Sequence, residues 1–358
     1  MSLPPKARVL ITGGLGFIGT KIVERLHESH EVLIVDNLHD QVHKDRSAVE
    51  AVPRGVRLLE RDVTDAEGMR EAALFEPDVV FHLAAETGTG QSLLQSRRHA
   101  QVNVVGTATL LDALSAHRLP SRVILPSSRA VYGEGYWLSD EGVALQAAPR
   151  STEQLDDGRW SPTAADGSSL VTALANDART QHPNPANVYA STKLAQEHML
   201  RSWCVSLGVS YAICRLQNVF GHGQALENPY TGVLTFMARQ AVAGKEIHVF
   251  EGGDIVRDFV NVRDVATALI AAGLASGVTD DVFDIGSGAG ETLYDVAVRL
   301  ASRVGAPAPV RTAEFRAGDV RSAFASIDNA SERLHYQPRV SLDEGLDDLL
   351  TWVKDEKR

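Results

Sequence analysis

A tyrosine and a lysine, Tyr189 and Lys193, lie four residues apart in the segment "NVYASTKLAQEH". Side chains at this spacing share one face of a helix and can reach a common point. Both can carry a proton in catalysis. Such pairs also recur by chance on exposed polar helix faces, so the pair alone does not establish a reaction. The rest of the chain has to supply a ligand site beside it.

A glycine-rich turn, "TGGLGFIG", provides a first indication of such a site. It follows the apolar run "ARVLITGG" and precedes "FIGTKIVERLHES", which has helical periodicity, so it joins a predicted strand to a predicted helix. Glycine allows the tight turn and lets backbone N–H groups and the helix N-terminus approach a pyrophosphate. We therefore predict a dinucleotide site whose turn residues are Gly13, Gly16, Phe17, Ile18 and Gly19.

An acidic residue, Asp36, ends the second predicted strand, "EVLIVDN", about twenty residues after the turn. A carboxylate there accepts hydrogen bonds from the hydroxyls of an adenosine ribose and repels a 2′-phosphate. The pattern favours NAD over NADP, with Asp36 and the adjacent Asn37 in the site.

Alternating strands and helices position these residues. The alternation predicts βαβ units and an α/β fold with a Rossmann-type, doubly wound parallel sheet. We predict a cofactor domain over residues 1–218 and 256–288, and a smaller C-terminal α/β substrate domain over 219–255 and 289–358. Residues 133–186 interrupt this rhythm and are rich in Gly, Pro, Ser and Asp, so this excursion is predicted to be a functional lid or a partly disordered loop.

Composition narrows the choice of partners and location. The 358 residues are 44% hydrophobic, typical of a globular protein with a substantial core, and no apolar run approaches 18 residues. A formal net charge of −11 argues against nucleic acid or an anionic membrane as partner. The two cysteines, Cys204 and Cys214, indicate a reducing compartment, and with no signal sequence apparent we expect a cytoplasmic protein. His82 and His222 have no partners at metal-ligand spacing.

A serine completes the candidate catalytic group, because the predicted strand "SRVILPSSRAVYG" brings Ser128 to the carboxyl edge of the sheet. With the glycine turn and the Tyr189 helix, the set resembles nucleotide-sugar epimerases and dehydratases of the extended short-chain dehydrogenase/reductase superfamily, over nearly the whole chain. The resemblance implies that Tyr189 transfers the proton and that Ser128 hydrogen-bonds the same substrate oxygen. It further implies that Lys193 binds the nicotinamide ribose and, with the charge of NAD, lowers the pKa of Tyr189 toward neutrality.

The resemblance extends to further cofactor contacts. It implies that "RDVTD" contacts adenine, that "FHLAAET" lies beside the cofactor, and that "VNVVGT" lies near the active-site strand. The corresponding residues are Asp62, Val63, Ala84, Ala85 and Asn103.

It also implies substrate contacts. Asn218 of "LQNVFG" is expected at the phosphate or ribose of the substrate, and Arg257 of "VRDFVNVRDVA" at the diphosphate. Arg321 of "FRAGDVR" is expected to add a second phosphate contact. Arg129, next to Ser128, is also expected to contact the substrate.

The residues that follow Ser128 bear on the reaction. Related 4,6-dehydratases and decarboxylases carry an acid directly after this serine, and related 3,5-epimerases carry a cysteine two residues after it. Here these positions are Arg129 and Ala130. The resemblance then implies a nucleotide-sugar 4-epimerase that oxidises C4 and reduces it again. An NAD(P)H-dependent 4-ketoreductase, a 4,6-dehydratase and a non-catalytic dinucleotide sensor stay as alternatives.

The excursion bears on the substrate. It resembles that of a bacterial branch that includes dTDP-L-rhamnose 4-epimerases, whose paired cysteines suggest a zinc knuckle. The corresponding stretch, "SPTAADGSS", has no cysteine, so we expect no metal, and both a dTDP-deoxysugar and a UDP-hexose stay open as substrates. Trp137 and Trp160 are expected to anchor the excursion rather than shape the sugar pocket. The family also implies a homodimer through the helices of Asn103 and Tyr189.

Overall fold

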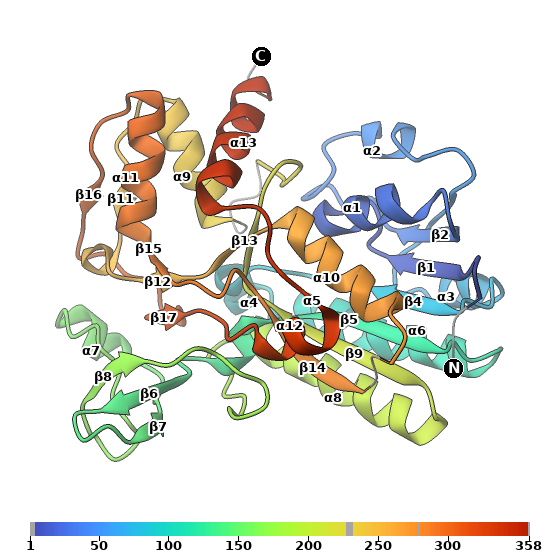
Figure 1. Cartoon of the computed structure of the whole chain (residues 1–358), viewed down its shortest axis with the longest axis horizontal. Coiled ribbons are helices and arrows are strands. Elements are labelled where there is room, and N and C mark those ends of the chain that lie inside the picture. Colours follow the sequence, from blue (N-terminus) through green and yellow to red (C-terminus); the bar gives the residue numbers. More distant parts are fainter. Residues whose placement is uncertain (1–3, 227–231, 278–279, 357–358) are drawn as a thin grey trace.

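The computed structural model describes residues 4–226, 232–277 and 280–356 (Figure 1). Its larger lobe contains a seven-stranded sheet in the order β14-β9-β5-β4-β1-β2-β3, and all of its strand pairs are parallel. The order reverses at β1, where ligands bind in folds of this type. The strands are β1 (Arg8–Thr12), β2 (Glu31–Asp36), β3 (Arg57–Glu60), β4 (Val79–His82), β5 (Arg122–Ser128), β9 (Ser210–Leu216) and β14 (Asp281–Ile285).

Helices cover both faces of this sheet. On one face α1 (Phe17–Leu26), α10 (Val262–Leu274) and α12 (Asp328–Leu334) share one apolar core. On the other, α3 (Ala66–Ala73), α6 (Gly106–Ser115) and α8 (Val188–Leu207) share a second. The predicted doubly wound α/β fold is confirmed. Short helices complete the lobe: α2 (Ser47–Glu50), α4 (Thr89–Leu94), α5 (Ser96–His99), the π-helix η1 (Ala100–Val105) and the 3₁₀ turn η2 (Arg129–Tyr132).

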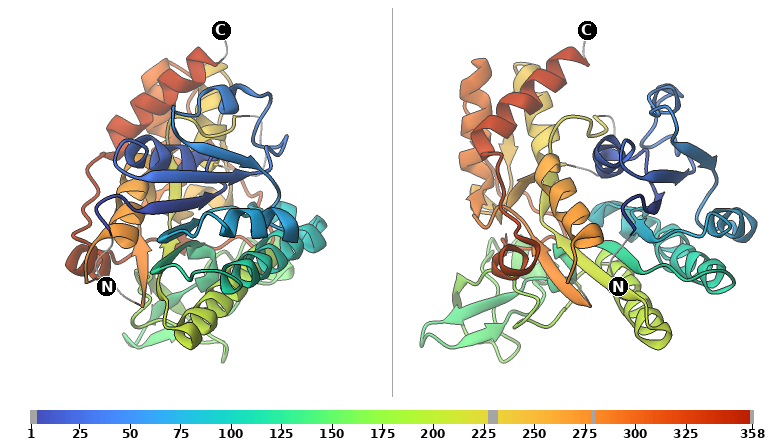
Figure 2. Two further views of the ribbon diagram at one scale, coloured as in Figure 1. Left: turned by 90° about the vertical axis from the view of Figure 1, so that its right-hand side faces the viewer. Right: turned by 45° about the vertical axis from the view of Figure 1, so that its right-hand side comes forward.

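A smaller lobe has its own core, built around Met237, Val296, Leu300 and Leu349. In both views of Figure 2 its yellow, orange and red helices gather in one part of the molecule. The parallel pair β10 (Asn218–Phe220) and β13 (Phe259–Asn261) lies where the chain passes between the lobes. The other elements are α9 (Val233–Val242), β11 (His248–Val249), η3 (Glu251–Gly253), β12 (Val256–Arg257), β15 (Glu291–Thr292), α11 (Leu293–Val304), β16 (Val310–Arg311), β17 (Ser322–Ala323) and α13 (Leu342–Asp355).

The predicted domain boundary differs from the structure near the C-terminus. Residues 289–358 were expected to belong entirely to the smaller lobe, but Ala330, Leu334 and Tyr336 are buried in the core of the larger one. The Tyr336 hydroxyl also donates a hydrogen bond to the Gly286 carbonyl at 2.7 Å. The chain therefore returns to the sheet before α13. Local sequence shows that such a helix is amphipathic but does not show which lobe it covers.

The excursion, residues 133–186, is an ordered subdomain rather than a loop (green, lower left in Figure 1). Its strands β6 (Tyr136–Ser139), β7 (Ala144–Gln146) and β8 (Leu170–Ala173) form an antiparallel sheet in the order β7-β6-β8, with α7 (Thr152–Asp156) beside it. Trp137 is 7% exposed in a small apolar cluster, and Trp160 packs against Gly252 of the smaller lobe. The predicted anchoring is confirmed for Trp160, whereas Trp137 packs inside the excursion itself.

Both cysteines are buried and free. Burial raises the pKa of the Cys204 thiol to about 12 and that of Cys214 further. Among the described residues, no helix is both long and apolar enough to cross a membrane.

Candidate active site

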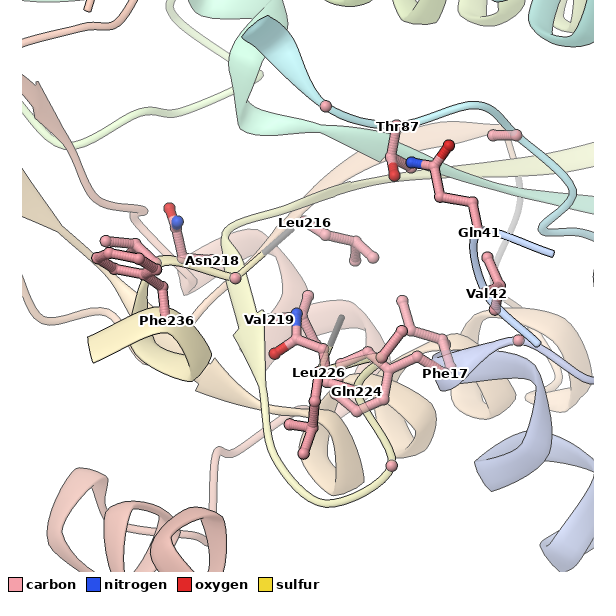
Figure 3. Close-up of a pocket in the computed structure, with 18 of the residues that line it drawn as sticks. Phe17, Gln41, Val42, Thr87, Leu216, Asn218, Val219, Gln224, Leu226 and Phe236 are labelled. Atoms are coloured by element: carbon pink, nitrogen blue, oxygen red, sulfur yellow. The ribbon is translucent and has the colours of Figure 1, made fainter. Parts of the chain in front are cut away.

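A cleft of about 1320 Å³ runs between the two lobes, at the carboxyl ends of the central strands. Figure 3 shows Phe17 and Gln41 on the side of the glycine turn, and Asn218 and Phe236 on the opposite side. Small-molecule sites usually measure about 300–1,000 Å³, so the cleft has room for a dinucleotide and part of a second ligand.

The glycine turn forms the cofactor side of this cleft. Gly13 has φ +68°, and a Cβ added there would lie 2.8 Å from the Ala84 backbone nitrogen. A Cβ at Gly19 would collide with the Gly13 carbonyl oxygen. Gly13, Gly16, Phe17, Ile18 and Gly19 all line the cleft. The bare backbone at the start of α1 is a cradle that fits a pyrophosphate.

Asp36 lies beside a second, smaller hollow on the cofactor side. Its carboxylate accepts hydrogen bonds from the backbone N–H groups of Leu15 at 3.0 Å and Leu38 at 2.9 Å, and it is 7% exposed. This hollow measures about 140 Å³ and matches the position expected for adenosine. The hollow brings together most of the predicted cofactor residues: Gly13, Gly16, Asp36, Asn37, Asp62, Val63, Ala84 and Ala85.

The wall of this hollow is held by the Asn37 side-chain amide, which donates to the Asp62 carboxylate at 2.7 Å. Burial would raise the pKa of Asp62, but hydrogen bonds from Thr64 and Asn37 outweigh it and lower that pKa. The carboxylate is therefore ionised at neutral pH, which suits a hydrogen-bond acceptor in this hollow.

Asn103 is a buried residue whose predicted contact with the cofactor stays a prediction. It is 0% exposed, on the π-helix η1, and is not among the described residues that line the cleft or the hollow. Its amide donates to the Glu86 carbonyl at 3.0 Å and the Thr192 hydroxyl at 2.9 Å, and it accepts from the Glu86 N–H at 2.8 Å. Asn103 therefore ties the loop after β4 to the helix that carries Tyr189.

The candidate catalytic residues come from two elements. Ser128 ends β5, and Tyr189 lies in the first turn of α8, where the Asn187 side chain caps the helix by accepting from the Ala190 N–H at 2.9 Å. Ser128 and Tyr189 line the cleft. Lys193 lies one helical turn further on and is 3% exposed.

The electrostatics of this group are unusual. Burial raises the pKa of Tyr189, opposed by a hydrogen bond with Ser128 and the charge of Arg129. Burial lowers the pKa of Lys193 to about 8, opposed by Glu197. Without a bound cofactor, Tyr189 is therefore the neutral phenol at neutral pH. The Lys193 amine is protonated in most molecules at that pH.

Glu197 was not among the predicted site residues. Its buried carboxylate accepts from Arg215 at 2.8 and 3.1 Å and from the Ser127 hydroxyl. The Arg215 guanidinium in turn lies 4.7 Å from the centre of the Tyr132 ring. This buried network supports both elements that carry the catalytic residues. The sequence signal that could have identified Glu197 is its spacing, because a glutamate four residues after Lys193 lies on the same helix face.

The low pKa of Lys193 leads to a first prediction. The lysine keeps its proton below about pH 8 and loses it above. If its charge supports catalysis, kcat/KM falls as the pH rises through about 8. In Lys193→Arg the guanidinium stays charged, so this alkaline limb should vanish even though the overall rate is lower. Initial rates across pH 6–10 test this, and an unchanged limb in Lys193→Arg would assign it to another group.

Basic and amide side chains form the opposite wall. Arg129 donates to the Asn218 amide oxygen at 2.9 Å, and Arg257 donates to Asp319 at 2.6 Å and to the Val320 carbonyl at 2.7 Å. Arg129, Asn218, Arg257 and Asp319 all line the cleft. Burial and the nearby Arg257 lower the pKa of Arg129 to about 10. Two guanidiniums at one wall suit a diphosphate. The acidic partner Asp319 was not predicted.

Arg321 is not placed as predicted. It is not among the described cleft-lining residues, and its guanidinium instead donates to the Glu251 carbonyl at 3.0 Å and pairs with Asp254 at 3.4 Å. Arg316, five residues earlier in the same segment, lines the cleft.

The two histidines differ. His82 is buried between the hydroxyls of Thr12, at 2.8 Å, and Thr107, at 2.9 Å. Burial lowers its pKa to about 3, so the ring is neutral and links β1 to α6 as a structural residue. His222 lines the cleft, with its ring 4.2 Å from that of Trp352.

The chain belongs to the NAD dependent epimerase/dehydratase family, whose sequence model matches residues 9–156 and 161–286. It is 41% identical to a dTDP-L-rhamnose 4-epimerase of Burkholderia thailandensis, over 99% of this chain and 97% of that protein.

Two solved structures of UDP-glucose 4-epimerases are similar to this chain in fold. A UDP-glucose 4-epimerase of Thermotoga maritima with UDP-glucose has a TM-score of 0.80 and 28% identity, covering 98% of this chain and 100% of that one. The Thermus thermophilus UDP-glucose 4-epimerase in complex with NAD has a TM-score of 0.78 and 28% identity, covering 97% and 99%.

Proposed function

We propose that the protein is an NAD-dependent nucleotide-sugar 4-epimerase, with a dTDP-linked deoxysugar such as dTDP-L-rhamnose as its first candidate substrate. The observation that carries this is the meeting of Ser128 and Tyr189 in the cleft, between the glycine turn and the Arg257 wall. The 41% identical relative, which covers nearly the whole chain, supports the choice of sugar.

In the proposed mechanism, Arg257, Arg316 and Asn218 hold the diphosphate, and the sugar points toward β5. Ser128 hydrogen-bonds the sugar 4-hydroxyl, and the phenolate form of Tyr189, which the charges of Lys193 and bound NAD would stabilise, takes its proton. Bound NAD supplies oxidising and reducing equivalents at C4 and a positive charge near Tyr189. Lys193 would bind the nicotinamide ribose of that cofactor. For inversion at C4 the sugar turns about its phosphate linkage and Tyr189 returns the proton, for which the large cleft leaves room.

The surroundings of Ser128 support an epimerase over a dehydratase. Ala130 is 7% exposed and carries no proton, and the Arg129 guanidinium is engaged with Asn218. An elimination needs a second acid or base at C5 or C6. Neither residue that follows Ser128 supplies one.

The deciding experiment is NMR of the purified protein in D2O, without added cofactor, with dTDP-L-rhamnose, UDP-glucose or UDP-GlcNAc. Conversion to the C4 epimer without deuterium in the sugar carbons is the expected result, and the sugar that reacts identifies the substrate. Deuterium at C5 or C6 with loss of water would instead mean a dehydratase. Reaction only with a 4-keto sugar and added NADH would mean a ketoreductase.

We infer a cytoplasmic homodimer that pairs through η1, α6 and α8. Exposed apolar side chains on and beside these helices support the pairing: Leu93, Leu94, Val105 and Val205, of which Leu94 is 85% exposed. The free buried cysteines fit a reducing compartment.

Leu94→Glu is expected to shift the protein toward the monomer in sedimentation, because a charge cannot be buried there without a partner. Val298→Glu is the matched control, since Val298 is a 41% exposed valine on α11 of the smaller lobe. An equal shift in both variants, or none in Leu94→Glu, would place the interface elsewhere.

A further inference from the structure

The excursion meets the smaller lobe at a buried ionic centre formed around Arg150, whose side chain is 1% exposed. Its guanidinium donates to Glu134 at 2.6 Å, to Glu251 at 2.7 Å and to the Trp160 carbonyl at 3.1 Å. It also donates to the backbone carbonyl of Asp319 at 3.0 Å. One side chain therefore joins two parts of the excursion to two segments of the smaller lobe.

The contacts of this centre converge on the short backbone segment 319–321. Arg150 binds the Asp319 carbonyl, and Glu134 accepts from the Arg321 N–H at 2.8 Å. The same segment presents the Asp319 carboxylate and the Val320 carbonyl to Arg257. The excursion therefore fixes, from behind, the acceptors that orient a cleft-lining arginine.

We propose that Arg150 is a positioning residue for nucleotide-diphosphate binding, and that the excursion acts as a brace behind the cleft. The proposal rests on the proposed function, since it assumes that Arg257 faces a diphosphate. None of residues 133–186, all of which the structure describes, lines the cleft. The lid expected from the sequence is therefore not found, and the excursion acts through segment 319–321.

The strain and charge of the centre support a positioning role. Glu251 has φ +49°, its side chain is 0% exposed, and its Oε1 has no hydrogen-bond partner. Such conformations persist only where the surroundings enforce them. The charges of Arg150 and Arg321 balance those of Glu134 and Glu251. Buried ionic groups of this kind are weak evidence for stability, and fixing one geometry is the better account of their presence here.

The test replaces the planar guanidinium of Arg150 by another cation, so that the charge is kept and the hydrogen-bond geometry is lost. In Arg150→Lys one ammonium cannot reproduce a planar fork that donates in several directions. We expect the Kd for dTDP, measured by calorimetry, and the KM for the nucleotide sugar to rise about tenfold or more, because small displacements at a binding wall are costly. We expect kcat and bound NAD per subunit to stay within about twofold. Arg159→Lys is the control, since Arg159 is 65% exposed in the same excursion.

A lower melting temperature with unchanged dTDP affinity and KM would overturn the proposal, because Arg150 would then be structural only. Should Arg150→Lys fail to fold, Glu134→Gln tests the same backbone segment: weaker dTDP binding supports the brace and unchanged binding overturns it. If the wild type binds dTDP but epimerises no sugar, the proposed reaction fails while dTDP affinity still tests the brace.

Discussion

Replacing Tyr189 by phenylalanine is expected to lower kcat by about 10³-fold while NAD and nucleotide-sugar binding persist. The change removes the hydroxyl that bonds with Ser128 but keeps the ring, which packs edge-on against His99 with ring centres 6.4 Å apart. The fold of α8 should therefore be retained. The measurement is the initial rate at saturating substrate, with bound NAD quantified in the same preparation.

Tyr294→Phe is the matched control, because that ring lies under Arg311 in the smaller lobe, 3.7 Å from its guanidinium carbon. Its activity should equal that of the wild type. If Tyr189→Phe kept a tenth or more of the rate, a group other than Tyr189 would be carrying the proton.

The second large effect is expected at the glycine turn. Gly13→Ala puts a Cβ 2.8 Å from the Ala84 nitrogen and 2.9 Å from the Ala84 Cα, at a residue with φ +68°. Both contacts are to backbone, so neither can be relieved by a rotamer change, and the turn must move away from the segment that follows β4. We expect NAD affinity to fall about 100-fold, equivalent to about 2.7 kcal/mol.

The control is Gly90→Ala, because a Cβ there meets nothing within 4 Å and the residue lies in α4. Titration of NAD into protein stripped of cofactor compares the variants. Wild-type affinity in Gly13→Ala would mean that the dinucleotide does not depend on this turn.

Much of the larger lobe could be predicted from the sequence, because its strands are continuous apolar runs, its helices are periodic and its glycine turn has a distinctive spacing. The excursion could not. Its strands are three or four residues long, and valines such as Val143 and Val171 are more than half exposed, so its pattern resembles a loop.

The cofactor and catalytic residues were easier to predict than the arginines. Ser128 and Tyr189 were assigned from the family resemblance, with a strand end and helix spacing in support, but the direction of Arg316 and Arg321 depends on the turn at Gly318, with φ +77°. The partner of Arg257 also depends on tertiary contact, since Asp319 lies 62 residues away in the chain. The hydrogen bonds of the Asn103 amide to Glu86 and Thr192 also depend on tertiary contact, and a local motif does not show them.

The path of the chain between the lobes has a mechanical consequence. It leaves the sheet at β10, returns at β13, leaves again after β14, returns for α12 and leaves a last time for α13. Several crossings between two lobes restrict their relative motion to bends that every crossing segment allows. We therefore expect the distance between the two walls of the cleft to change little through a catalytic cycle, so that inversion occurs by rotation of the sugar rather than by movement of the lobes.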